Sequence, residues 1–161
     1  MHPVQALFGL GCLVTLALNG WAWSRDRASY ADAFGAAFLM MSIWVSANVL
    51  YAVAGFTEGS RVYPLLYALA SLVTLHSCLH DWRSLWKGGL LLCFLLATGL
   101  SLGFWSLTPP PDPLSYWTID NVIFAFAVLF TAFPGGGRLA GSVVPGLLRR
   151  VRLGFQRLVG S

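Results

Sequence analysis

Charged residues are scarce in this chain of 161 residues. Asp, Glu, Lys and Arg make up 10% of it, whereas hydrophobic residues make up 57% and the mean hydropathy is +0.71. This composition lies far outside that of water-soluble domains and indicates an integral membrane protein. The sequence also lacks a Walker loop, a GxSxG elbow, a dinucleotide-binding fingerprint and paired catalytic carboxylates. The absence of these motifs favours a protein that is not an enzyme.

Cysteine is also scarce, with three residues in the whole chain. Cys12, Cys78 and Cys93 all fall inside apolar stretches, so we expect no disulfide framework of the kind found in small secreted domains. An isolated cysteine in such a position usually acts as a small apolar side chain. We therefore expect helix packing, rather than covalent crosslinks, to hold the fold.

Long apolar runs dominate what the sequence does contain. Five of them come close to the roughly 20 residues that a helix needs to cross about 30 Å of hydrocarbon. They cover residues 4–23, 30–56, 62–82, 88–107 and 115–133. Because the connections are short, each helix should lie antiparallel beside the next one. Only Met1, His2 and Pro3 precede the first run, without the basic residues that begin a signal peptide, so we expect this run to be retained as a helix.

The basic residues predict the orientation of this bundle. Nine of the ten Lys and Arg residues fall between the first two runs, between the third and fourth, or after the fifth, and only Arg61 falls on the other side. Short loops rich in Lys and Arg face the cytoplasm. Tryptophans, which favour the headgroup level, agree: Trp21, Trp23, Trp82 and Trp86 fall at the inner boundary, and Trp105 and Trp117 at the outer one. The sequence therefore predicts an all-α, five-helix transmembrane bundle over residues 1–133, in a membrane of the bacterial inner-membrane type, with the N-terminus outside and the C-terminus in the cytoplasm.

Residues 134–161 differ from the bundle in composition. They begin with PGGGR, which predicts a helix break and a flexible hinge, and they hold five arginines and no acidic residue. A helical wheel separates an apolar face from a basic face. The basic face carries Arg149, Arg150, Arg152, Gln156 and Arg157, and the apolar face carries Leu148, Val151, Phe155, Leu158 and Val159, with Leu153 as the misfit. We expect an amphipathic cytoplasmic helix in the membrane interface that binds anionic lipid headgroups; nucleic acid is the weaker alternative, because such a tail meets anionic lipid first.

The stretch LHSCLHDWRSLWK, residues 75–87, contains a candidate metal site. His76 and His80 lie one helical turn apart on one face, and Asp32 is expected at a similar depth on the preceding helix. Two histidines at this spacing can bind a divalent metal when a carboxylate completes the ligand set. The sequence favours a structural alternative, in which His80 lies at the headgroup level and His76 bonds to Asn19 or Asp32. A bis-histidine haem would need a second copy of the chain, because His2 lies on the far side, and no other cofactor is predicted.

Further polar residues fall inside the apolar runs. Asn48, Asp120 and Asn121 lie near the predicted outer boundary, and Asn19 lies toward the inner one. Polar side chains at such depths are costly and normally pair. We expect all four to make polar contacts between helices, with Asn48 and Asp120 forming one of them.

A GxxxG pair, Gly99 and Gly103, predicts close helix packing, either within the chain or between copies, and assembly is favoured because short loops leave the helices uncovered. The first functional hypothesis is a non-enzymatic membrane protein, a small subunit or scaffold that binds partners or lipid through its helix faces and basic tail. A holin-like pore is the first alternative. A metal-binding or redox protein that uses His76 and His80 is the second.

Overall fold

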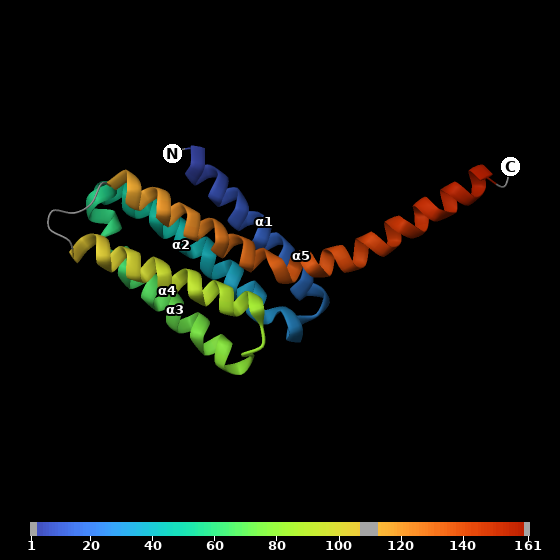
Figure 1. The fold of residues 1–161 in the computed structure, drawn as a ribbon, viewed down its shortest axis with the longest axis horizontal. Coiled ribbons are helices and arrows are strands. Elements are labelled where there is room, and N and C mark those ends of the chain that lie inside the picture. The colour runs from blue at the N-terminus through green and yellow to red at the C-terminus, as the bar shows by residue number, and fades with distance from the viewer. Residues whose placement is uncertain (1–2, 107–112, 160–161) are drawn as a thin grey trace.

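The structure consists of five long helices (Figure 1). The computed structural model describes residues 3–106 and 113–159, without the side chains of residues 56–57, 113–116, 154–155 and 157–159. The helices are α1 (Pro3–Arg25), α2 (Arg27–Ser60), α3 (Tyr63–His80), α4 (Leu85–Ser106) and α5 (Pro113–Val159). No strand occurs in the described residues, so the predicted all-α class is confirmed.

Each helix contains a segment that is long and apolar enough to cross a membrane. These segments are Pro3–Arg25, Arg27–Gly55, Glu58–His80, Leu85–Ser106 and Trp117–Leu153. The first four begin and end within a few residues of the runs predicted from the sequence, whereas the fifth continues well past residue 133. The five apolar helices fit a multi-pass membrane protein.

Tight connections join α1 to α2 and α3 to α4 at one end of the bundle, which we call the basic end. Asp26 separates α1 from α2 and caps the second helix, because its carboxylate accepts a hydrogen bond from the Ser29 N–H at 3.2 Å. This hydrogen bond holds the pKa of Asp26 below its ordinary value. The cap ends one helix and starts the next within a single residue, so α1 and α2 pack side by side.

α5 is the central helix of the bundle. It packs against α1, α4 and α2, while α3 packs mainly against α4. The buried core between them includes Met40 of α2, Phe94 of α4 and Phe124 of α5. α2 and α3 follow each other in the chain but make few contacts; the rings of Tyr51 and Tyr63 meet at 5.5 Å near their connection. The expected pairing of each helix with the next is therefore weakest here, and a cleft lies between α2 and α3 at the basic end.

α5 does not break at PGGGR, which corrects the flexible hinge expected after residue 133. The helix runs through Pro134 and the three glycines that follow it, over 47 residues and about 70 Å. Gly135 approaches α1 so closely that a Cβ atom there would lie 2.7 Å from the carbonyl carbon of Leu18. Glycine is needed at this position because it lets two helix backbones approach this far. Beyond the crossing, α5 turns away and projects from the bundle (Figure 1).

Candidate functional site

A cleft with a volume of about 490 Å³ lies between α2, α3 and α4 at the basic end. Small and apolar side chains line its deeper part, and polar side chains line its mouth. The deeper part includes Gly35, Ala36, Leu39, Val73 and Leu90, and the mouth includes Asp32, His76, Ser77, His80 and Lys87. The structure thus brings Asp32, His76 and His80 around one space, as their predicted depths implied, and adds Lys87 to them.

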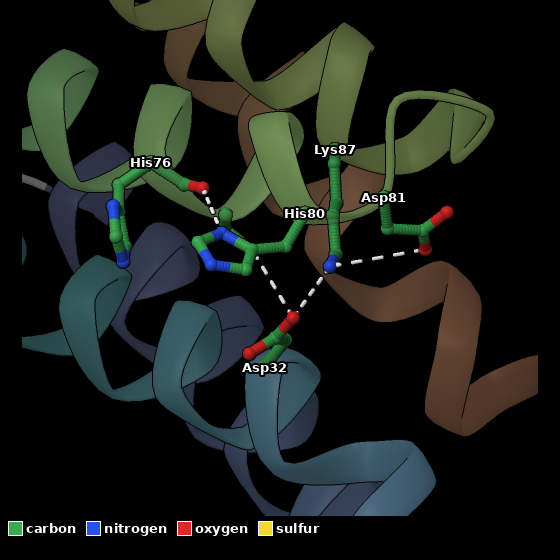
Figure 2. Close-up of polar contacts among 6 residues, drawn as sticks. Asp32, His76, His80, Asp81 and Lys87 are labelled. Carbon is green, nitrogen blue, oxygen red and sulfur yellow. Dashed lines mark hydrogen bonds and ion pairs between the residues drawn. The ribbon is translucent and has the colours of Figure 1, made fainter.

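Asp32 connects the three helices at the mouth of the cleft. Its carboxylate accepts a hydrogen bond from the Ser77 hydroxyl of α3 at 3.1 Å and pairs with the Lys87 ammonium of α4 at 2.5 Å. The same ammonium lies 3.8 Å from the Asp81 carboxylate. We call these four residues the Asp32 cluster; Figure 2 shows the two carboxylates on either side of the ammonium.

The two sides of this ion pair differ in exposure. The Lys87 side chain is 6% exposed, whereas the Asp32 side chain is 55% exposed. A buried ammonium is costly unless an acidic group pairs with it, so Asp32 and Asp81 stabilise Lys87 in place. The carboxylates keep half of their surface available, and this surface can bind a further group.

The sequence analysis placed Lys87 in a basic boundary loop and missed its role in the cleft. The structure shows that Lys87 begins the buried stripe of α4, which continues through Leu90, Phe94, Ala97 and Ser101. These positions repeat every three or four residues, the spacing of one helix face. Extending the stripe by one turn toward the start of the helix would have placed Lys87 inside the bundle.

The two histidines lie at the mouth but do not form a ligand set with Asp32. His80 Nδ1 lies 2.9 Å from the His76 carbonyl oxygen, a contact within α3, and the two rings meet edge to face at 4.7 Å. Figure 2 shows the His76 ring turned away from Asp32, with the His80 ring between them. Within residues 3–106 and 113–159, no group of three or more His, Cys, Asp or Glu side chains is placed to hold a metal ion.

The chain matches no known family model, no curated protein and no solved structure. Its function must therefore be argued from its own residues. What the cleft offers chemically is a pair of half-exposed carboxylates, an exposed imidazole pair and an apolar space beneath them.

Asn19 makes the most completely buried interhelical polar contact described, with 0% of the residue exposed. Its Nδ2 donates to the Thr131 carbonyl of α5 at 2.8 Å and to the Thr15 carbonyl of its own helix at 3.0 Å. Its Oδ1 accepts a hydrogen bond from the Gly135 N–H at 3.0 Å. We call this arrangement the Asn19 clamp. The structure gives Asn19 these partners rather than His76, which lies at the cleft.

The clamp explains how α5 passes through Pro134. A proline inside a helix has no N–H to donate and disturbs the preceding turn. In a regular helix the Gly135 N–H donates to the Thr131 carbonyl, so the Asn19 amide bonds to both members of one helical hydrogen-bond pair. Membrane helices tolerate proline and glycine when a neighbouring helix satisfies the backbone groups that they free.

The polar residues at the opposite end form separate contacts. Asp120 is buried and accepts a hydrogen bond from the Tyr67 hydroxyl at 2.9 Å, whereas Asn48 donates to the Trp44 carbonyl of its own helix at 2.8 Å. Both line a small cavity of about 50 Å³ together with Asn121, whose buried Nδ2 has no hydrogen-bond partner. The structure thus places Asn48 and Asp120 around one cavity but gives them different hydrogen-bond partners.

The remaining candidate residues face outward. A Cβ atom added at Gly99 or Gly103 would meet no atom within 4 Å, so the chain does not use this pair for its own packing; Ala97 and Ser101 are the buried small residues of α4. Arg149, Arg150 and Arg152 are exposed on the projecting part of α5. The side chain of Arg157 lies outside the described residues.

Proposed function

We propose that this chain is a non-enzymatic subunit or scaffold of a membrane assembly, which displays the end of α5 for binding to anionic lipid headgroups or a partner protein. The observation that carries this proposal is the exposure of α5 beyond the bundle. Every side chain from Leu139 to Leu153 is exposed, while the preceding part of the same helix is held in the bundle. A long helix that leaves its own core uncovered over four turns favours contact with something outside the chain.

The anchoring of α5 supports this role. The Asn19 clamp bonds the helix to α1, and Arg138 lies over the ring of Tyr30 on α2, with 5.1 Å between the guanidinium carbon and the ring centroid. The direction in which the helix projects is therefore set by the bundle. A fixed direction suits a scaffold, because it lowers the entropy lost when the segment binds.

Charge and aromatic residues support the orientation within the membrane. We place the basic end in the cytoplasm of a bacterial-type cell, because nine of the ten basic residues gather there or in the projecting helix. At this end Arg25, Arg27 and Arg83 lie over neighbouring tryptophan rings at 5.9, 5.1 and 5.1 Å. Pairs of this kind suit the headgroup level, where the ring is half in lipid and the cation is in water. The arginines of the projecting helix would then lie beside anionic headgroups.

The projecting helix can be tested with an environment-sensitive fluorophore on a single cysteine. Leu148→Cys places the label on the apolar face, and Gly146→Cys places it near the angle of Arg150 on the basic face. In proteoliposomes that contain phosphatidylglycerol, we expect the label at 148 to be shielded from an aqueous quencher and the label at 146 to stay accessible. Replacing Arg149, Arg150 and Arg152 by glutamine should remove this shielding.

Two results would contradict the proposal. Equal accessibility of both labels in neutral and anionic vesicles, with no protein crosslinked to either position in cells, would mean that the projecting helix binds neither lipid nor partner. Loss of membrane potential on induced expression would favour the holin-like alternative over the scaffold.

The open glycine pair on α4 is the proposed surface for assembly between copies or with another membrane subunit. Gly99 and Gly103 lie four residues apart and have open space above them, so another helix can approach closely there. We expect Gly99→Leu with Gly103→Leu to lower the oligomeric mass in mild detergent, measured by light scattering. Gly88→Leu, at another open position of α4, is the control; an unchanged mass in the double variant would remove this surface from the proposal.

A further inference from the structure

The cleft between α2 and α3 lies in a region that the bilayer would surround. It opens to the outside of the bundle, where Val73 is 59% exposed and both histidines are exposed. Side chains of the bundle do not fill it: a Cβ atom added at Gly35, on the cleft wall, would meet no atom within 4 Å. An open apolar space at this position takes up lipid chains, because hydrocarbon is the surrounding solvent.

The mouth of the cleft selects the headgroup that accompanies such a chain. Two carboxylates, Asp32 and Asp81, share the single ammonium of Lys87, and each is more than half exposed. The mouth therefore carries an excess of negative charge that attracts a cationic group with N–H donors. The imidazole rings of His76 and His80 lie beside these carboxylates, and imidazole N–H groups can donate to phosphate oxygens.

We propose that the cleft is a binding site for one molecule of phosphatidylethanolamine from the leaflet that surrounds the basic end. An acyl chain enters the apolar space beside Gly35, Leu39 and Val73. The primary ammonium of the headgroup donates to Asp32 and Asp81, and the imidazole groups contact the phosphate. The proposal does not depend on the projecting helix or on the side of the membrane that the basic end faces.

Other lipids fit the mouth less well. An anionic lipid such as phosphatidylglycerol would place its negative charge beside two carboxylates, which is unfavourable. Phosphatidylcholine carries the same net charge as phosphatidylethanolamine, but its trimethylammonium group has no N–H to donate to Asp32. The pair of zwitterionic lipids therefore tests the headgroup contact, and the anionic lipid tests the charge.

The experiment measures lipid bound to the whole chain in mild detergent by native mass spectrometry. Palmitoyl-oleoyl phosphatidylethanolamine, phosphatidylcholine and phosphatidylglycerol are added separately to delipidated protein. We expect one phosphatidylethanolamine per chain, bound at least tenfold more tightly than either of the other two. Equal binding of the three lipids, or no bound lipid above the detergent background, would overturn the proposal.

Two glycine variants locate the site. Gly35→Leu fills the cleft, whereas Gly88→Leu adds the same side chain at an open position of α4 that does not line it. Neither position has a neighbour that a new Cβ would meet, so both variants should fold, which thermal unfolding checks. We expect Gly35→Leu to weaken phosphatidylethanolamine binding at least tenfold and Gly88→Leu to leave it unchanged. Undiminished binding by Gly35→Leu would overturn the assignment of the lipid to this cleft.

Discussion

The Asn19 clamp and the Asp32 cluster both place polar groups between apolar helices, but they are built differently. Asn19 is uncharged and 0% exposed, and it bonds to backbone atoms of its own helix and of α5. Asp32 is charged and half-exposed, and it bonds to the side chains of Ser77 and Lys87. The first contact removes polar groups from their surroundings completely, whereas the second leaves part of them open.

Physical chemistry gives each design a different use. A neutral amide whose donors and acceptor are all bonded can be buried at little cost, and its removal leaves backbone groups unpaired. A charged pair loses solvation when it is buried and contributes little net stability. We therefore assign the clamp to folding and the cluster to binding. The experiments below test this division, in order of decreasing expected effect on stability.

The close crossing at the clamp should be the most sensitive position. In Gly135→Val, the new Cβ would lie 2.7 Å from backbone atoms of α1, so the helices must separate and the clamp must break. We expect a loss of about 3 kcal/mol in the free energy of unfolding, measured by steric trapping in bicelles. Gly136→Val is the matched control, because a Cβ at that position meets no atom within 4 Å. Equal losses in both variants would mean that helix propensity, not the crossing, limits stability here.

Removal of the clamp amide should have the next largest effect. Asn19→Ala leaves the Thr131 carbonyl and the Gly135 N–H without their side-chain partner beside Pro134, and we expect a loss of about 2 kcal/mol in the same measurement. Asn48→Ala is the control, because the Asn48 amide donates within its own helix. Its loss should stay below about 0.5 kcal/mol. If the two variants lost equal stability, the clamp would not be special among the buried amides.

Local sequence signals predicted the helices well but not how they meet. Hydropathy located four of the five apolar segments within a few residues, because it depends only on neighbours in the chain. The partner of Asn19 is more than a hundred residues away, and the PGGGR stretch that contributes it is typical of a break in soluble proteins. The tolerance of α5 for this stretch depends on the neighbouring helix, which no local pattern contains.

Lys87 shows the same limit for the candidate site. Its position next to Trp86 predicted the headgroup level, and that rule places basic residues by depth only. The side to which the ammonium points depends on the rotation of α4 about its axis, which the buried stripe of that helix reveals. The sequence thus placed Asp32, His76 and His80 at one depth, but it did not show that a lysine would pair with the aspartate.

The two partners of the ion pair should differ when they are removed singly. Asp32→Asn leaves the buried ammonium with Asp81 at 3.8 Å as its acidic partner, and we expect a loss of about 1 kcal/mol. Lys87→Met removes the buried charge and leaves a carboxylate that is already half-exposed, so its effect should be close to zero. Unfolding of both variants in bicelles gives the comparison. A larger loss in Lys87→Met would show that the charge pair stabilises the fold and would contradict its assignment to binding.

The smallest effect is expected at Ser77, the contact of the cluster with α3. Ser77→Ala removes one hydrogen bond to Asp32, but the carboxylate keeps Lys87 and is exposed enough for water to replace the hydroxyl. We expect a change below about 0.5 kcal/mol in unfolding. The hydroxyl of Thr131, by contrast, is fully buried beside the clamp and bonds to the Ala127 carbonyl, so no water can take its place. A loss above about 1 kcal/mol in Ser77→Ala would mean that the mouth of the cleft is as dry as the clamp. A mouth that excludes water would leave no room for a lipid headgroup, so this small effect tests the division of roles most directly.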